Sequence, residues 1–206
     1  MKILPFIKKD LSANIINFVS ISLLALFLIA FDTSNVACYL FVVSFLAFYL
    51  FYSDSQRRVD QFLVSLPVSR KRLVLSRYIV MIGYTLLVLV CHILIDSFFH
   101  VFESALYTPR LDSLTVALII MFISVLIAIT VPIYYIFRSY IVAGTICFIV
   151  LLFTMMVSFG IINSIDVHQK LRDLFIPAQI PLILIAMLSL YVSYTLSSFV
   201  FKRKDL

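Results

Sequence analysis

Long apolar stretches alternate with short polar segments along this chain of 206 residues. A stretch of about 20 apolar residues is long enough to cross the hydrocarbon core of a bilayer as an α-helix. Six such stretches are present, Ile15–Phe31, Val36–Tyr52, Tyr78–Phe99, Leu114–Phe137, Tyr140–Ile162 and Pro177–Phe201. The pattern predicts an all-α integral membrane protein with six transmembrane helices, in which residues 1–206 form a single transmembrane domain.

The longest polar segment, residues 53–77, separates the second and third predicted spans. Ser53 or Asp54 can cap the start of a helix there. Apolar residues then recur at the i, i+3, i+4 and i+7 spacing of an amphipathic helix, while polar residues fall largely on its other faces. The apolar set is Val59, Phe62, Leu63 and Leu66, and the polar set is Arg57, Arg58, Asp60 and Gln61. We therefore expect a short amphipathic helix directly after the second span.

A sharp corner follows this predicted helix. Pro67 should end the helix at Leu66, because proline disfavours helical geometry in the residue before it. Ser69 is placed to cap a second helix that runs through Arg70–Arg77 into the third span. The result is a rigid elbow held against the membrane, which is suited to contact with a soluble partner. An interfacial helix without a partner is the alternative.

Two other segments flank the spans. In residues 1–14, one helical face carries Ile3, Leu4, Ile7 and Leu11, and the lysines lie mostly elsewhere, as in a helix that lies in the membrane interface. A basic flank that only sets the topology is an equal alternative. Residues 163–176 form the most polar stretch on the opposite side of the membrane. We expect a short helical element there.

Composition and charge fix the orientation of the predicted spans. The chain is 64% hydrophobic and 13% charged, with a net charge of +6 and a mean hydropathy of +1.16. With a cytoplasmic N-terminus, thirteen of the sixteen Lys and Arg residues are cytoplasmic, and only Arg110, Lys170 and Arg172 lie outside. The positive-inside rule then predicts that both termini are cytoplasmic. The positive charge faces anionic lipid, and nucleic acid is not expected as a partner.

Three ionisable residues of the third span, His92, Asp96 and His100, are spaced four apart and share one helical face. Such groups raise a functional hypothesis in a membrane, here a polar pathway with a proton relay or part of a metal site. At about 1.5 Å of rise per residue, however, Asp96 lies roughly 28 Å from Arg77, near the outer surface. A polar outer vestibule or interhelical hydrogen bonding explains the three residues without chemistry, and we favour that interpretation.

Pro132 interrupts the fourth span near its cytoplasmic end. Its ring and its missing N–H predict a kink. The kink either serves the packing of the helices, which we expect, or leaves carbonyl groups free to line a cavity.

Motifs of catalysis are absent from the chain. There is no G-x-x-x-x-G-K-[ST] phosphate loop, no H-E-x-x-H pair and no G-x-S-x-G elbow. Cys38, Cys91 and Cys147 all fall in apolar runs, where they are expected to be buried side chains and not a metal or disulfide set. We expect a protein that is not an enzyme by itself and that holds no cofactor, metal or catalytic residue.

The corner LVSLPVSRKRLVLSRY, Leu63–Tyr78, preceded by Asp60, resembles the cytoplasmic loop of small six-span permeases of type-2 ATP-binding-cassette (ABC) exporters. The Lys-rich start of the chain, Met1–Asn14, and the outer segment Asn163–Phe175 also have counterparts in that family. The resemblance covers the architecture of the whole chain, whereas the motif itself is confined to residues 60–78.

The resemblance implies a division of labour. A separate cytoplasmic ABC ATPase subunit, which binds ATP and Mg²⁺, would dock on a coupling helix at Asp54–Leu66. Two permeases, identical or related, would then move between inward and outward states in a bacterial plasma membrane. The ATPase-coupling residues implied are Asp54, Arg57, Arg58, Val59, Asp60, Phe62, Leu63, Leu66, Pro67, Ser69 and Arg70.

The leading hypothesis is thus the membrane subunit of an exporter. Its predicted interior is nearly free of charge, which suits an amphipathic peptide or another hydrophobic cargo better than ions. A non-transporting immunity or sensor subunit, whose loop binds a soluble partner, is one alternative. A proton-coupled secondary transporter that uses His92 and Asp96 is the other, although no inverted repeat is visible in the chain.

Overall fold

The computed structural model describes residues 15–30, 35–56, 70–101, 113–137, 139–167 and 179–203. These residues form six α-helices: α2 (Ile15–Ala30), α3 (Asn35–Gln56), α5 (Arg70–Val101), α6 (Ser113–Ile136), α7 (Tyr140–Val167) and α9 (Gln179–Arg203). The described residues include no strand. The all-α prediction is confirmed for this part of the chain.

Five of the helices, α3, α5, α6, α7 and α9, are long and apolar enough to cross a membrane. The chain is therefore built as a multi-pass membrane protein. Helix α2 has 16 residues, fewer than the about 20 that a bilayer core requires, so the sixth span stays a prediction. The expected interfacial helix at residues 1–14 lies outside the described residues.

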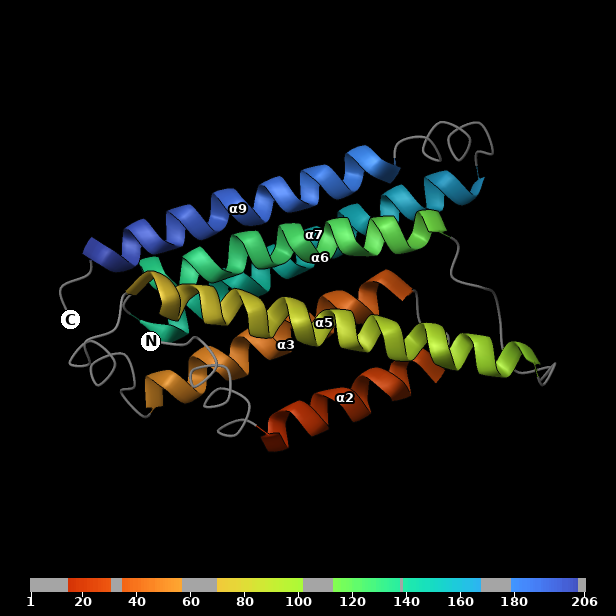
Figure 1. The fold of residues 1–206 in the computed structure, drawn as a ribbon, viewed down its shortest axis with the longest axis horizontal. Helices are drawn as coiled ribbons and strands as arrows, with labels where there is room; N and C mark the ends of the chain where they lie inside the picture. The colour runs from red at the N-terminus through yellow and green to blue at the C-terminus, as the bar shows by residue number, and fades with distance from the viewer. Residues whose placement is uncertain are drawn as a thin grey trace.

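The helices run alternately up and down the bundle (Figure 1). The ends of α3, α6 and α9 and the starts of α5 and α7 gather at one end, on the left of the view. We call this the loop-side end, because α3 ends and α5 begins there, at the two flanks of segment 57–69. Helix α6 contacts α3, α5, α7 and α9, whereas α2 packs on α3 and α5 at one edge of the bundle.

The central position of α6 follows from its sequence. Its residues are apolar all round, as expected of a helix that is covered on several sides, and Ile119, Leu126, Ile127 and Val131 are fully buried. Helices α7 and α9, in contrast, expose large apolar side chains over much of their length. Such faces suit contact with lipid and not with water.

Several helices extend beyond the apolar runs that predicted them. Helix α3 continues through Ser53 and Asp54 to Gln56, so the expectation that one of these two residues starts a new helix is wrong. Helix α5 already begins at Arg70, as predicted. Helix α7 includes residues 163–167, which we had assigned to a separate outer element. The reason is that hydropathy marks the residues that need lipid, whereas backbone hydrogen bonds continue the helix into the polar boundary.

Candidate functional site

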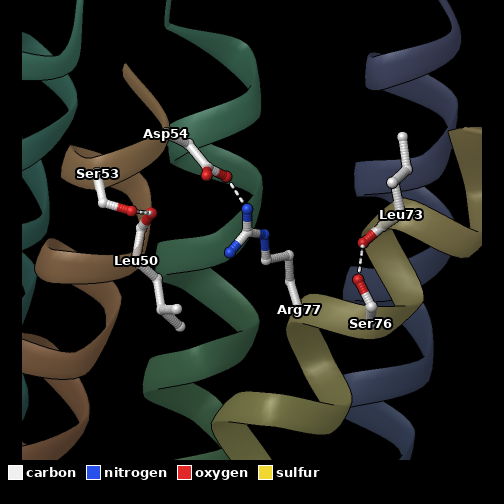
Figure 2. A network of polar contacts seen from close by, with 6 residues as sticks. All are labelled: Leu50, Ser53, Asp54, Leu73, Ser76 and Arg77. Atoms are coloured by element: carbon white, nitrogen blue, oxygen red, sulfur yellow. Dashed lines mark hydrogen bonds and ion pairs between the residues drawn. The ribbon is translucent and has the colours of Figure 1, made fainter. Parts of the chain in front are cut away.

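An ion pair joins the two helices that flank segment 57–69. Asp54 lies in the last turn of α3 and Arg77 lies two turns into α5. The Oδ2 atom of Asp54 faces the Nη2 atom of Arg77, and the side chains of both residues are buried, with exposed fractions of 8% and 6% (Figure 2). Buried charges persist in a fold when they are paired. The pair therefore holds α3 against α5 close to the points where the chain leaves one helix and enters the other.

The surroundings of Arg77 are apolar and aromatic. Its guanidinium lies 6.0 Å from the centre of the Phe51 ring, within the range of a cation–π contact. The neighbouring residues Val74 and Tyr78 are buried. Ser76, also buried, donates its hydroxyl proton to the carbonyl of Leu73 in its own helix at 2.8 Å. The first turns of α5 are thus packed into the bundle.

Arg70 connects the start of α5 to the end of α9. Its Nη1 atom donates to the carbonyl oxygens of Phe201 and Lys202, at 3.1 and 3.0 Å. The last carbonyls of a helix have no partner within that helix. A cation there also interacts favourably with the negative end of the helix dipole. The guanidinium in addition lies 5.9 Å from the centre of the Phe201 ring. Arg70 therefore caps α9 from a different helix.

An aromatic cluster completes the loop-side end. It consists of Phe51, Tyr134, Tyr135, Tyr140 and Phe201, which come from α3, α6, α7 and α9. The ring of Phe51 stacks on Tyr134 with centroids 4.3 Å apart, and Tyr135 lies 5.1 Å from Phe201. Tyr134 and Tyr140 stack at 5.8 Å. These rings pack α3, α6, α7 and α9 together at the loop-side end, next to the helix ends that flank segment 57–69.

The predicted coupling residues divide into two groups. Asp54 and Arg70 are described by the structure, and both face neighbouring helices. The others lie outside the described residues: Arg57, Arg58, Val59, Asp60, Phe62, Leu63, Leu66, Pro67 and Ser69.

Arg77 is a site residue that the sequence reasoning missed. A signal for it was present, because Arg77 is a charged residue at the start of the apolar run on one flank while Asp54 carries the opposite charge on the other.

His92 takes part in an interhelical hydrogen bond. Its Nδ1 atom lies 2.8 Å from the hydroxyl of Tyr39 on α3, and both residues are buried. Asp96 and His100 follow on the same helix, α5, but their side chains lie outside the described part of the structure. Among the described residues no three His, Cys, Asp or Glu side chains gather as a metal site. For His92, the interpretation as a packing contact is the one that the geometry fits.

Pro132 is coupled to α9 through hydroxyl groups. Proline has no N–H, so the carbonyl of Ala128, four residues earlier, has no helical donor. Ser193 donates its proton to that carbonyl at 2.7 Å. The hydroxyl of Tyr78 lies 2.5 Å from Ser193 Oγ and 3.0 Å from Ser197 Oγ. Since each hydroxyl has one proton, the donors run from Ser197 to Tyr78, to Ser193, to Ala128. The freed carbonyl is thus bonded to α9, whereas the kink itself stays a prediction.

A comparison with protein families gives a match over nearly the whole chain. A family model described as "ABC-2 family transporter protein" matches residues 5–202. No curated protein matches the chain, and no solved structure does. The matched range includes α2, α3, α5, α6 and α7 in full, α9 as far as Lys202, and all of segment 57–69.

Proposed function

Because the chain belongs to the ABC-2 family of transporter proteins, we propose that it is the membrane-spanning permease subunit of an ATP-driven exporter. ATP and Mg²⁺ are bound by a separate cytoplasmic ABC ATPase subunit, since the sequence contains no phosphate-binding loop. Both termini are cytoplasmic in this proposal, and the loop-side end of the bundle faces the ATPase.

Segment 57–69 is the proposed docking element. Its apolar ridge, Val59, Phe62, Leu63 and Leu66, fills a groove of the ATPase, as amphipathic helices do in many complexes. The charged residues beside the ridge, Arg57, Arg58 and Asp60, set the register. Asp54 and Arg70 take a different role from the one expected, because their side chains contact other helices of the bundle. In this proposal they position the docking element.

The observation that carries this proposal is that both flanks of segment 57–69 are fastened to the bundle. Asp54 and Arg77 join α3 to α5, and Arg70 joins α5 to α9. The bonds from Tyr78 through Ser193 extend this connection to α6. A push on the segment by the ATPase would therefore move packed helices together, as in rigid-body transitions between two states.

The cargo and the second permease follow from the membrane-spanning part. Few charged residues occur within the helices, so the pathway suits an amphipathic peptide or another hydrophobic molecule. A bundle of six helices is too small to enclose a wide pathway for such a cargo. The transporter therefore contains two permeases, either two copies of this chain or this chain and a related one.

The test is purification of the chain from its native membrane in a mild detergent, followed by an assay for a co-purifying ATPase. The double variant Phe62→Glu, Leu63→Glu should lose the ATPase while it still inserts and folds. The control variant Gln56→Glu, Gln61→Glu adds the same charge at polar positions and should retain the ATPase. Retention by the ridge variant, or equal loss in both variants, would contradict docking through the apolar ridge.

A further inference from the structure

A groove of about 420 Å³ opens on the surface of the bundle between α3 and α7. Phe45 and Phe48 of α3 and Phe148 of α7 form its walls, and Thr130 of α6 belongs to its floor. Each of the three phenylalanines is exposed, so the groove opens sideways. Its volume lies in the range of small-molecule pockets.

The position of the groove along α3 places it within the membrane. It extends along α3 from Phe41 to Phe48, which are thirteen and six residues before Asp54 in the sequence. At about 1.5 Å per residue, the groove lies roughly 9–20 Å from the level of Asp54. With a hydrocarbon core about 30 Å thick, the groove runs from the loop-side half of the bilayer to just beyond its middle. The loop-side half is the cytoplasmic leaflet in the proposed orientation.

Contacts between α3 and α7 close the groove toward the loop-side end. The hydroxyl of Tyr140 donates to the carbonyl of Phe48 at 2.9 Å, and the rings of Tyr52 and Tyr140 lie 5.5 Å apart. A molecule therefore enters this groove from the side, out of the lipid, and not from the aqueous phase at the loop-side end.

The chemistry of the lining excludes water as the occupant. The hydroxyls of Thr130 and Thr145 are bonded to carbonyls of their own helices, at 2.8 and 2.9 Å. Ser44 Oγ is buried and has no hydrogen-bond partner in the described part of the structure. The lining also includes the Tyr134 hydroxyl and the Cys147 thiol, which bond to neighbouring side chains. A bound water needs two to four polar partners, and these mainly apolar walls offer few that are not already bonded.

The opening of the groove faces the lipid along about two turns of α3, whereas an α-helix is about 10–12 Å across. An extended hydrocarbon chain is narrower, and the bilayer presents such chains at the opening. We infer that the α3–α7 groove is a binding site for one acyl chain of a phospholipid from the loop-side leaflet.

The absence of tryptophan from the chain makes this site directly measurable. Phe148→Trp places a fluorophore in the groove wall, and Ile149→Trp places one on the neighbouring exposed residue, which does not line the groove. The purified variants are titrated in detergent with phosphatidylcholine that carries a dibrominated acyl chain. Bromine quenches tryptophan at short range. Quenching of Phe148→Trp should saturate at one lipid per chain, whereas quenching of Ile149→Trp should rise linearly with the lipid content of the micelle.

Gly144 provides the variant that fills the groove. A Cβ atom at this position would lie 3.8 Å from the Phe48 ring, an ordinary contact, so Gly144→Ala should preserve saturable quenching. Gly144→Leu reaches into the groove and should abolish it, with an unchanged helical circular dichroism spectrum as the control for folding. Linear quenching at both tryptophan positions, or no effect of Gly144→Leu, would overturn the inference.

Ser44→Ala separates an acyl chain from a polar ligand. The variant makes the lining fully apolar at this point, so binding of an acyl chain should be unchanged or stronger. Loss of saturable quenching in Ser44→Ala would show that the site recognises a polar group, and it would overturn the assignment to an acyl chain. None of these measurements involves the ATPase, so their outcome is independent of the proposed export function.

Discussion

Ser193 on α9 donates its hydroxyl proton to the carbonyl oxygen of Ala128 on α6 at 2.7 Å. Ala128 precedes Pro132 by four residues, which is the spacing at which a proline removes the helical donor. A side chain of another helix thus replaces the lost backbone hydrogen bond in a setting that offers little water. The backbone hydrogen bond that α6 lacks at Pro132 is therefore replaced by a bond from Ser193 of α9, and the two positions form one structural unit.

This pairing predicts that the stability cost of Ser193→Ala depends on whether Pro132 is present. Ser193→Ala should lower the free energy of unfolding by roughly 1–2 kcal/mol, because it leaves the Ala128 carbonyl without a donor in a part of the helix that spans the membrane. In a Pro132→Ala background the helix regains that donor, so the same substitution should cost less. Thermal unfolding of the four proteins in detergent measures this double-mutant cycle.

Ser189→Ala is the matched control, because Ser189 bonds only to Ala186 within α9 among the described contacts. Its cost should be small in both backgrounds. An equal cost of Ser193→Ala with and without Pro132 would contradict the pairing.

The ion pair between Asp54 and Arg77 should be needed for both stability and partner docking. Asp54→Asn removes the carboxylate charge that faces a buried guanidinium, and such a change costs roughly 3–5 kcal/mol. The exchange Asp54→Arg with Arg77→Asp restores opposite charges and should recover part of the folded protein and of the bound ATPase. Ser53→Ala, one residue away, should leave both unchanged. Folded yield and co-purified ATPase activity are the measurements.

If Asp54→Asn folds fully and binds the ATPase normally, the pair has no positioning role. Failure of the exchanged variant alone would not decide the matter, because arginine and aspartate differ in length. The Asn variant is therefore the decisive comparison.

Loss of the Arg70 side chain should loosen the end of α9 while the rest of the bundle stays intact. Arg70→Ala removes the donor to the carbonyls of Phe201 and Lys202, and the last turn should fray. With an effect of about 1 kcal/mol, amide exchange in that turn becomes about fivefold faster. Hydrogen exchange with mass spectrometry measures it, with Lys71→Ala, at an exposed position, as the control. Uniformly faster exchange across the whole protein would argue against a local cap.

The contact between Tyr39 and His92 should behave as a packing hydrogen bond. Tyr39→Phe and His92→Phe each leave a buried polar group without this bond, so each should lower the unfolding temperature. Replacing both partners by apolar groups is often close to neutral, and the double variant should cost less than the sum of the two. A strictly additive cost would show that the two side chains do not depend on each other.

The membrane-spanning helices could be predicted from the sequence, because hydropathy reports directly on burial in lipid. Apolar runs located α3, α5, α6, α7 and α9, and Leu66-Pro67 with Ser69 placed the start of α5 next to Arg70. The ends of the helices were harder to predict. Ser53 and Asp54 are of types that commonly cap the start of a helix, yet they lie in the last turn of α3. The carboxylate of Asp54 pairs with Arg77 of α5 and does not cap a helix start.

The contacts of the candidate site depend on how the helices are rotated and packed, which a single sequence does not encode locally. Arg77 and Asp54 stand at opposite flanks of a polar segment, where charged residues commonly reach toward water or lipid headgroups. Only the packing of α3 on α5 brings the two together. Pro132 signalled an unpaired carbonyl, but its donor, Ser193, is one of several serines on α9.

The cap that Arg70 places on α9 has a consequence for the order in which the protein is made. Helix α9 follows the other described helices in the chain, so the ribosome synthesises Phe201 and Lys202 long after Arg70. The hydrogen bonds from Arg70 to Phe201 and Lys202 therefore form only after the last described helix has inserted. A nascent chain that stalls before α9 lacks this cap, and its loop-side end is left incomplete. Assembly with a cytoplasmic partner would then select for chains whose membrane insertion has been completed.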